Sequence, residues 1–114
     1  MTMTDCLFCK IVAGEIPATK VAETDGFLAF RDINPQAPVH VLAIPKKHVA
    51  SLNYADDALL IGDLVLFARD VARYEGLADD GYRVVINTNA GAGQTVFHVH
   101  AHVLGGRAMR WPPG

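Results

Sequence analysis

Near its end, the chain reads FHVHAHVL from residue 97 to residue 104. Histidines alternate with apolar residues here, which is typical of a β-strand that buries one face, because successive side chains of a strand point to opposite sides. We therefore expect the last strand of the fold to run over Val96–Leu104. Its core-facing positions would be Phe97, Val99, Ala101 and Val103. Its opposite surface would carry His98, His100 and His102.

Three imidazoles on one surface indicate chemistry rather than packing, because each buried ring costs desolvation and needs hydrogen-bond partners. Either neutral rings ligate zinc, which can activate water, or one ring attacks phosphorus while its neighbours manage protons. The loop before the strand offers backbone N–H groups that could close around phosphate oxygens, although a plain turn explains its glycines equally well. Its small and polar residues are Asn87, Gly91, Gly93, Gln94 and Thr95.

Outside this segment, the apolar pattern predicts a small α+β domain. A long helix is expected over Asp57–Gly76, because apolar residues recur from Leu60 to Val71 at spacings of four, three and four, with Asp56 or Asp57 as its N-cap. Further elements are a short helix over Phe8–Ala13 and strands around Val21 and over Phe27–Phe30, His40–Ile44 and Tyr82–Asn87. The chain thus predicts one domain over residues 1–114, with an antiparallel sheet of about five strands, one long helix and one short N-terminal helix.

The predicted long helix carries more apolar surface than one sheet face needs. A second apolar row flanks the first and consists of Ile61, Val65, Ala68 and Ala72. A chain of this size buries roughly two thirds of its unfolded surface, so dimerisation would support a thin core. We therefore expect a homodimer that uses this helix face.

Composition and charge exclude several classes of protein. The 114 residues carry a net charge of −2 and contain no long basic run, so duplex nucleic acid is not an expected partner. No apolar run approaches the roughly twenty residues that cross a bilayer, so membrane spanning is not expected. The first residues, Met1–Leu7, lack the basic and apolar regions of a secretory signal, and we expect a cytoplasmic location.

The chain resembles the histidine triad (HIT) family, whose signature is three histidines at alternate positions followed by small or apolar residues. Here the motif is HVHAHVLGG at residues 98–106. The resemblance covers nearly the whole chain, in FCKI at 8–11, EIP at 15–17, AFRDINPQAP at 29–38, His40, IPKKH at 44–48, GQTV at 93–96 and WPPG at 111–114. GGR at 105–107 and the terminal WPPG are most similar to the Hint branch of nucleotide-binding proteins, rather than to dinucleoside polyphosphate hydrolases or galactose-1-phosphate uridylyltransferases.

This resemblance implies a HIT-like fold and hydrolysis of the P–N bond of purine nucleoside 5′-phosphoramidates. His100 would attack the α-phosphorus and form a covalent nucleotidyl-histidine intermediate, which water then hydrolyses. His102 would hold the phosphate oxygens. His40 and His98 would complete the network of protons and hydrogen bonds. No cofactor is required for this chemistry.

The same resemblance implies where the nucleotide binds. Asp32 would accept hydrogen bonds from the ribose hydroxyls, and Asn87 would lie beside the phosphate, next to Gly93 and Gln94. Trp111 would reach across the dimer interface toward the active site of the partner subunit. The base would lie between apolar side chains of Phe8, Phe30, Ile33 and Leu42.

Two positions depart from the family pattern. Thr95 stands where the family usually has a Ser that assists the leaving amine, and its hydroxyl should serve the same role. Arg31 stands where members of this branch often carry a His, and it could change the preferred base or leaving group. The resemblance does not fix the direction of that change.

Cys6 and Cys9 form a Cys-x-x-Cys pair. In a reducing compartment such a pair indicates metal binding, two free thiols or a redox pair, and the last is disfavoured because no thioredoxin-like pattern surrounds it. The resemblance to bacterial family members implies that these two thiolates, His48 and His98 hold one zinc. Two thiolates and two imidazoles complete a tetrahedral structural site. His98 would then not be free for proton transfer.

Three other functions stay open at this point. The protein could be a nucleotide-binding scaffold with vestigial catalysis, whose function is partner binding through the wide helix face and survives loss of His100. It could be a dinucleoside polyphosphate hydrolase. Finally, the three histidines could hold a catalytic zinc hydroxide, in which case removal of metal would abolish activity.

Overall fold

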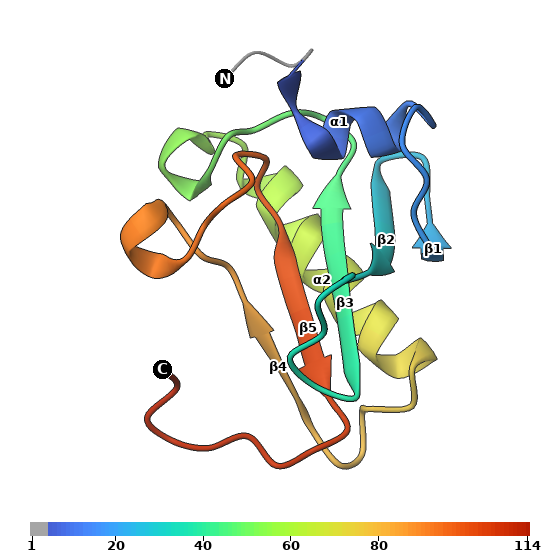
Figure 1. Cartoon of the computed structure of the whole chain (residues 1–114), viewed down its shortest axis with the longest axis vertical. Coiled ribbons are helices and arrows are strands. Elements are labelled where there is room, and N and C mark those ends of the chain that lie inside the picture. Colours follow the sequence, from blue (N-terminus) through green and yellow to red (C-terminus); the bar gives the residue numbers. More distant parts are fainter. Residues whose placement is uncertain (1–4) are drawn as a thin grey trace.

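Five strands form one antiparallel sheet in the computed structural model, which describes residues 5–114 (Figure 1). Their order across the sheet is β1-β2-β3-β5-β4. Their bounds are Lys20–Glu23 for β1, Phe27–Arg31 for β2, Val39–Pro45 for β3, Tyr82–Val85 for β4 and Ala101–Gly105 for β5. The predicted five-stranded antiparallel sheet is thus confirmed. The cytoplasmic location was predicted from residues 1–7, and residues 1–4 of that stretch lie outside the described residues.

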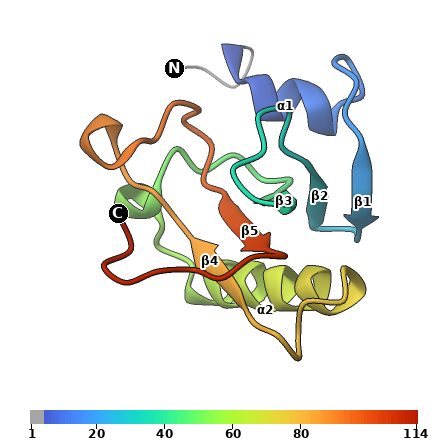
Figure 2. The same cartoon turned by 60° about the horizontal axis from the view of Figure 1, so that its bottom comes forward.

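Two α-helices accompany the sheet in the described part of the chain: α1 (Leu7–Val12) and α2 (Ala58–Tyr74). The long helix α2 lies along one face of the sheet, whereas α1 lies on the other side of it (Figure 2). Short 3-10 turns occur at Leu52–Tyr54 and Ala90–Ala92. The prediction of one long and one short helix is confirmed. Within residues 5–114, no helix is long and apolar enough to cross a membrane.

Alternation along the strands divides the core into two clusters. In β3, Val41 and Ala43 face α2, while Leu42 and Ile44 face α1, as expected for side chains that alternate between the two faces. The first cluster lies between the sheet and α2 and contains Ala29, Val41, Ala43, Leu64, Phe67, Ala68, Val71, Ala72, Leu77, Ala101 and Val103. The second lies under α1 and contains Cys6, Phe8, Ile11, Leu28, Phe30, Leu42 and Ile44. The β2–β3–β5 strands therefore hold the two clusters apart.

The last strand is shorter than predicted, because β5 begins at Ala101 rather than at Val96. The ladder pairs Ala43 with Ala101, so its next hydrogen-bonded partners would be Pro45 and Val99. Pro45 has no N–H to donate, and the Val99 N–H instead bonds the Val49 carbonyl at 2.6 Å. Consequently His98 and His100 lie before the strand, and only His102 lies in it.

The two apolar rows predicted on the long helix differ in burial. Leu64, Phe67 and Val71 of the first row are buried, and so are the two alanines of the second row. Val65 of that second row is exposed, as are Leu59 and Leu66. The helix therefore packs one face on the sheet and leaves an apolar strip of these three side chains uncovered.

Asp57, rather than Asp56, caps α2: its carboxylate accepts hydrogen bonds from the N–H groups of Leu59 and Leu60, at 3.0 and 3.2 Å. We expect Asp57→Ala to lower the free energy of unfolding by about 1 kcal/mol, the usual cost of losing such a cap. Urea denaturation measures this loss. Asp56→Ala removes the neighbouring carboxylate and serves as the control, with a change within about 0.5 kcal/mol. Equal losses in the two variants would contradict the capping role.

Candidate active site

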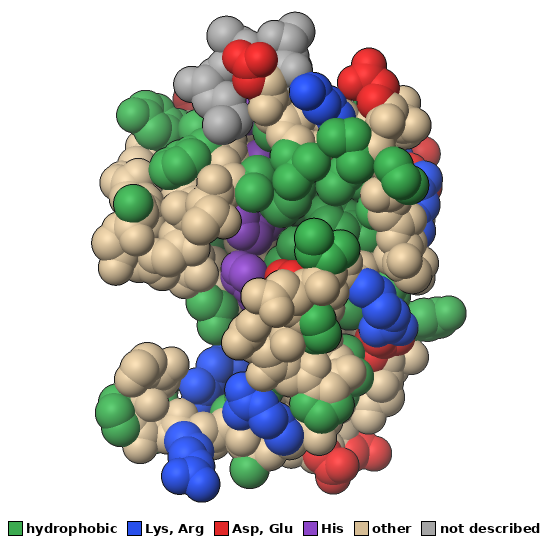
Figure 3. All heavy atoms as spheres, in the orientation of Figure 1, with side chains coloured by type: hydrophobic (Ala, Val, Ile, Leu, Met, Phe, Trp, Pro, Cys, Tyr) green, Lys and Arg blue, Asp and Glu red, His purple; other side chains and the backbone are tan. Residues whose placement is uncertain are grey.

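A cavity of about 640 Å³ opens between α1, the segment that joins α1 to β1, and the sheet. Figure 3 shows histidine side chains at the bottom of a hollow, beside a hydrophobic patch. The predicted catalytic and substrate-binding residues that line this cavity are Phe8, Phe30, Asp32, Ile33, Leu42, Thr95, His100 and His102. Ile33 is fully exposed at its rim, so it is not a core residue. The cavity therefore has an apolar wall and a polar end that carries two imidazoles.

Several lining residues escaped the sequence reasoning, and they are Leu7, Ile11, Ile16, Pro17, Ala18, Thr19 and Val96. Ile11 lies three residues after Phe8 on α1, so helical spacing places both on one face. That signal could have identified Ile11. The residues from Ile16 to Thr19 follow the helix in an irregular segment that has no periodicity, and only the tertiary structure brings them to the cavity.

Other predicted site residues lie outside the cavity lining. His98, Asn87, Gly93 and Gln94 do not line it, and Trp111 is 82% exposed in the C-terminal segment. The side chain of Gln94 is occupied within the chain. Its Oε1 accepts the Asn89 N–H at 2.8 Å, and its Nε2 donates to two backbone carbonyls, those of Ala50 and Val96. Gln94 thus closes the glycine-rich loop on itself.

His100 is held in one tautomer by the backbone. Its Nδ1 lies 2.7 Å from the carbonyl oxygen of His98, so Nδ1 carries the proton and donates. The other ring nitrogen, Nε2, is therefore left with a free lone pair. Burial lowers the pKa of His100 below its usual value of 6.5, so the ring is neutral at neutral pH. The Phe8 ring packs edge to face against the imidazole of His100, and the centroids of the two rings are 5.1 Å apart.

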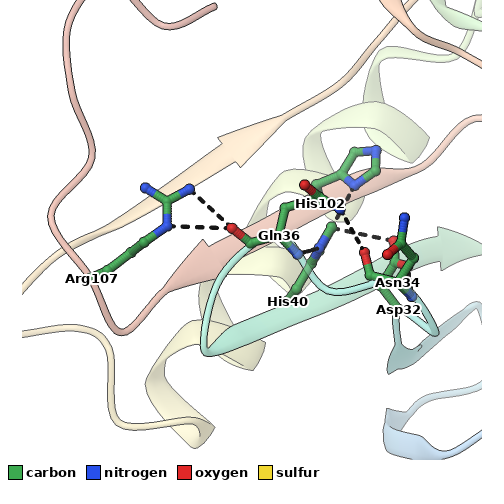
Figure 4. Close-up of polar contacts among 6 residues, drawn as sticks. All are labelled: Asp32, Asn34, Gln36, His40, His102 and Arg107. Carbon is green, nitrogen blue, oxygen red and sulfur yellow. Dashed lines mark hydrogen bonds and ion pairs between the residues drawn. The ribbon is translucent and has the colours of Figure 1, made fainter.

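A chain of hydrogen bonds likewise sets the tautomer of His102 (Figure 4). The Gln36 N–H donates to His40 Nδ1 at 3.0 Å, so the proton of His40 is on Nε2. That Nε2 lies 2.9 Å from His102 Nδ1 and 3.4 Å from a carboxylate oxygen of Asp32. His102 Nδ1 thus accepts, and its Nε2 carries a proton as a donor. Burial, with smaller effects from His100 and His40, lowers the pKa of His102 to about 4.

His98 belongs to a separate cluster with both cysteines and His48. Its Nε2 donates to the Pro45 carbonyl at 2.7 Å, which leaves Nδ1 unprotonated at 3.4 Å from Cys6 Sγ and 3.5 Å from Cys9 Sγ. His48 Nδ1 is 3.4 Å from Cys9 Sγ. The four ligand atoms all lie within 4.8 Å of one another. Sequence reasoning named this set, and the structure brings all four residues together.

These four donors fit a zinc ion. Soft sulfur and neutral nitrogen are the donors of closed tetrahedral zinc sites. Burial and the neighbouring Cys6 raise the pKa of Cys9 to about 11, and a divalent cation would offset this penalty on the thiolate. Asp32, His40 and His102 form a second close group, but hydrogen bonds with one another and with Gln36 already occupy their facing nitrogens.

Arg31 borders the cavity, yet its guanidinium points to another part of the molecule. It forms an ion pair with Glu75, which follows helix α2. Strand alternation explains this direction, because Phe30 turns toward the α1 cluster and its neighbour turns toward the α2 side. The structure therefore directs the positive charge of Arg31 away from the floor of the cavity.

Comparison with known proteins agrees with this arrangement. Residues 13–109 match the HIT domain family. This chain belongs to the HIT domain family. A HIT family hydrolase from Legionella pneumophila is 55% identical in its crystal structure, with a TM-score of 0.93, and the match covers 96% of this chain and all of that one.

Two sequence relatives are similar over nearly their full length. A HIT-like protein of Synechocystis is 54% identical over 112 residues, which covers 96% of this chain and 97% of the relative. A 14 kDa zinc-binding protein of Zea mays is 51% identical over 112 residues, which covers 95% of this chain and 87% of the relative. The relatives of this chain thus include a HIT family hydrolase and a protein named for zinc binding.

The low pKa of His102 predicts how the stability depends on pH. An unfolded histidine titrates near 6.5, whereas the folded ring stays neutral down to about 4. The unfolded state binds more protons between these values, so the contribution of His102 is present above pH 6.5 and is lost as the pH falls toward 4. Urea midpoints measured across this range should therefore decrease as the pH falls.

His102→Gln is the control for this measurement, because it keeps a neutral polar side chain that does not titrate. The dependence of the midpoint on pH should be shallower in this variant than in the natural protein. Equal slopes in the two proteins would show that His102 titrates like an ordinary histidine.

Proposed function

We propose that this HIT-family protein hydrolyses the P–N bond of purine nucleoside 5′-phosphoramidates through a covalent intermediate on His100. One observation carries the proposal: His100 is neutral, its Nδ1 proton is bound to the His98 carbonyl, and it lines the cavity. A neutral imidazole with one free nitrogen is a competent nucleophile and, after reaction, a tolerable leaving group.

In the first step, the lone pair of His100 Nε2 attacks the α-phosphorus. A new N–P bond forms while the bond to the amine nitrogen breaks, and the amine takes that electron pair together with a proton. The proton comes from water through the hydroxyl of Thr95, which lines the cavity: the hydroxyl gives its proton to the amine and takes one back from water. In the second step, water attacks phosphorus and gives up a proton to the solvent, the His100–phosphorus bond breaks with its electron pair returning to Nε2, and the nucleoside monophosphate is released.

His102 supports both steps as a hydrogen-bond donor. Its Nε2–H is available because Nδ1 accepts from His40. A neutral donor can bind a phosphate oxygen without protonating it, and it becomes more effective as negative charge builds up on that oxygen. His40 acts behind His102, since it does not line the cavity itself.

The rest of the cavity fits a nucleoside. A volume of about 640 Å³ lies within the range of small-molecule sites. Phe8, Phe30 and Leu42 provide apolar surface for a base. The rings of Phe8 and Phe30 meet edge to face, with their centroids 5.4 Å apart. Asp32 lines the same cavity, and its carboxylate, which lies 3.4 Å from His40 Nε2, would accept hydrogen bonds from the ribose hydroxyls.

We also propose that Cys6, Cys9, His48 and His98 hold one structural zinc ion. The donor set and its mutual distances support this, and a HIT relative of Zea mays is named as a zinc-binding protein. Such a site would attach the start of α1 to the segment that carries His100. Both cysteines are free thiols. A cytoplasmic location, which would keep them reduced, is part of the same proposal.

A homodimer is the assembly that we propose. Leu59, Val65 and Leu66 form an apolar strip on the outer side of α2, and β4 is an edge strand of the sheet. Exposed apolar strips of this kind mark association surfaces. The C-terminal segment with Trp111 is also exposed, so it is available to reach a partner subunit as the resemblance implies.

The first test is release of AMP from adenosine 5′-phosphoramidate by the purified protein. We expect His100→Asn to lose activity by at least about 1,000-fold, because removal of a nucleophile eliminates the covalent route. Mass spectrometry of a rapidly quenched reaction should find a nucleotidyl adduct on the peptide that contains His100. Thr95→Ala is the comparison, and it should retain more activity than His100→Asn.

The outcomes of this test separate the alternative functions. If the natural protein and His100→Asn are both inert yet bind AMP, the protein is a nucleotide-binding scaffold. If a diadenosine polyphosphate is cleaved faster than the phosphoramidate, the dinucleoside hydrolase function is correct. Turnover that survives in His100→Asn would show that His100 is not the nucleophile.

The zinc proposal is tested by elemental analysis and thermal unfolding. The purified protein should contain stoichiometric zinc, and Cys9→Ser should contain much less, because it removes one of the donors. A chelator should lower the melting temperature of the natural protein and have little effect on Cys9→Ser. A zinc-free natural protein with an unchanged melting temperature after chelation would contradict the proposal.

A further inference from the structure

The C-terminal segment contacts the turn between β2 and β3 through one side chain. Arg107 donates two hydrogen bonds to the carbonyl oxygen of Gln36, from Nε at 3.3 Å and from Nη2 at 3.1 Å (Figure 4). A third bond runs from Nη1 to the carbonyl of Ala108 at 3.1 Å. The guanidinium is thus fixed at both of its ends, and it binds a backbone atom 71 residues away in sequence.

Gln36 connects this contact to the active-site histidines. Its N–H donates to His40 Nδ1 at 3.0 Å, and its side chain donates to the carbonyl of Asn34 at 3.0 Å. The Asn34 N–H in turn bonds an Asp32 carboxylate oxygen at 2.8 Å. The turn from Asp32 to Pro38 therefore holds the carboxylate and the N–H that flank His40, and Arg107 binds the residue at its centre.

The backbone of the C-terminal segment comes unusually close to this turn. Gly106 has a φ of +87°, and a Cβ at this position would lie only 2.9 Å from Cβ of Pro38. Glycine is required here both for the left-handed conformation and for the close approach. This approach is what lets Arg107, the next residue, reach back to the Gln36 carbonyl.

Arg107 has no part in the reaction described above, because it does not line the cavity. Its influence would pass through the tautomer of His40. If the Gln36 N–H moved away, His40 could carry its proton on Nδ1, and its Nε2 would then be an acceptor facing His102 Nδ1. His102 would have to move its own proton to Nδ1, and its Nε2 lone pair would face the anionic phosphate. A hydrogen-bond donor to the substrate would become a repulsive acceptor.

We propose that Arg107 is a positioning residue that holds the Asp32–Pro38 turn, so that the Gln36 N–H keeps His40 and His102 in the tautomers that the substrate needs. The geometry of Figure 4 supports this, since an unbroken series of hydrogen bonds joins Arg107 to His102. The consequence for catalysis rests on the proposed phosphoramidate hydrolysis. The effect on the tautomers of His40 and His102 does not depend on that proposed function.

The test compares Arg107→Ala with Arg107→Lys, which keeps one donor for the Gln36 carbonyl. Arg110→Ala is the matched control, because it removes a cation from the same segment and retains the backbone carbonyl that accepts from Arg83 at 2.8 Å. Long-range ¹H–¹⁵N spectra of the imidazoles report which ring nitrogen carries the proton. Steady-state kinetics on adenosine 5′-phosphoramidate give kcat and KM separately.

We expect Arg107→Ala to move part of the His40 and His102 population to the other tautomer. Its kcat should fall about tenfold, less than complete loss of a proton-handling group, and its KM should change less than kcat. Arg107→Lys should recover part of both effects, and Arg110→Ala should match the natural protein in its spectra.

Unchanged imidazole spectra in a folded Arg107→Ala protein would overturn the proposal. So would an equal change in Arg110→Ala, since the effect would then come from general loosening of the segment. If Arg107→Ala fails to fold, Arg107→Met takes its place, because it keeps an extended side chain without a donor for the Gln36 carbonyl; unaltered tautomers in that folded variant overturn the proposal, and shifted ones support it. If the natural protein cleaves no phosphoramidate while Arg107→Ala still shifts the tautomers, the proposed function fails and the positioning role stands.

Discussion

The hydrogen bond from the His98 ring to the Pro45 carbonyl, 2.7 Å long, constrains most of the site. Pro45 cannot donate to a β-ladder, and its carbonyl accepts from an imidazole, so the pairing of β3 with the last strand stops at Ala101. The ring of His98 thereby turns toward the two cysteines, while its backbone carbonyl is directed to His100 Nδ1. One residue thus belongs to the cysteine cluster through its ring and to the active site through its backbone. Leaving such a buried donor unpaired would cost about 1–3 kcal/mol.

Burial and hydrogen bonding act together on the imidazoles of this HIT domain. Removal from water lowers the pKa values of His40, His98, His100 and His102, so the rings are neutral in the folded protein. A neutral imidazole has one donor and one acceptor, and only the surroundings decide which nitrogen is which. Backbone groups make that decision here, through the carbonyls of His98 and Pro45 and the N–H of Gln36. The imidazoles are therefore oriented by parts of the chain that substitution of side chains does not alter directly.

Three segments that are distant in sequence meet at the site, and each has a distinct task. Helix α1 and its N-cap supply Phe8 and the cysteine pair, the turn before β3 supplies Asp32 and Gln36, and the segment around β5 supplies His98, His100 and His102. The sheet provides the fixed frame, since β3 and β5 are paired neighbours and carry His40 and His102 on the same face. Arg107 adds a contact between the end of the chain and the turn.

Local apolar runs and helical spacing were sufficient to predict the α+β class, the strands over Phe27–Phe30 and His40–Ile44, which extend to Phe27–Arg31 and Val39–Pro45 in the structure, and the long helix with its buried row, because such patterns report local backbone conformation. The resemblance supplied the set of proposed zinc ligands, and the structure brings these four residues together. Periodicity failed at His98 and His100, since a strand pattern cannot show that its partner strand carries a proline at the pairing position. The tautomers, the role of Gln36 and the contact of Arg107 also depended on tertiary structure. They rest on hydrogen bonds between residues separated by as many as 71 positions, and such partners leave no trace in local sequence patterns.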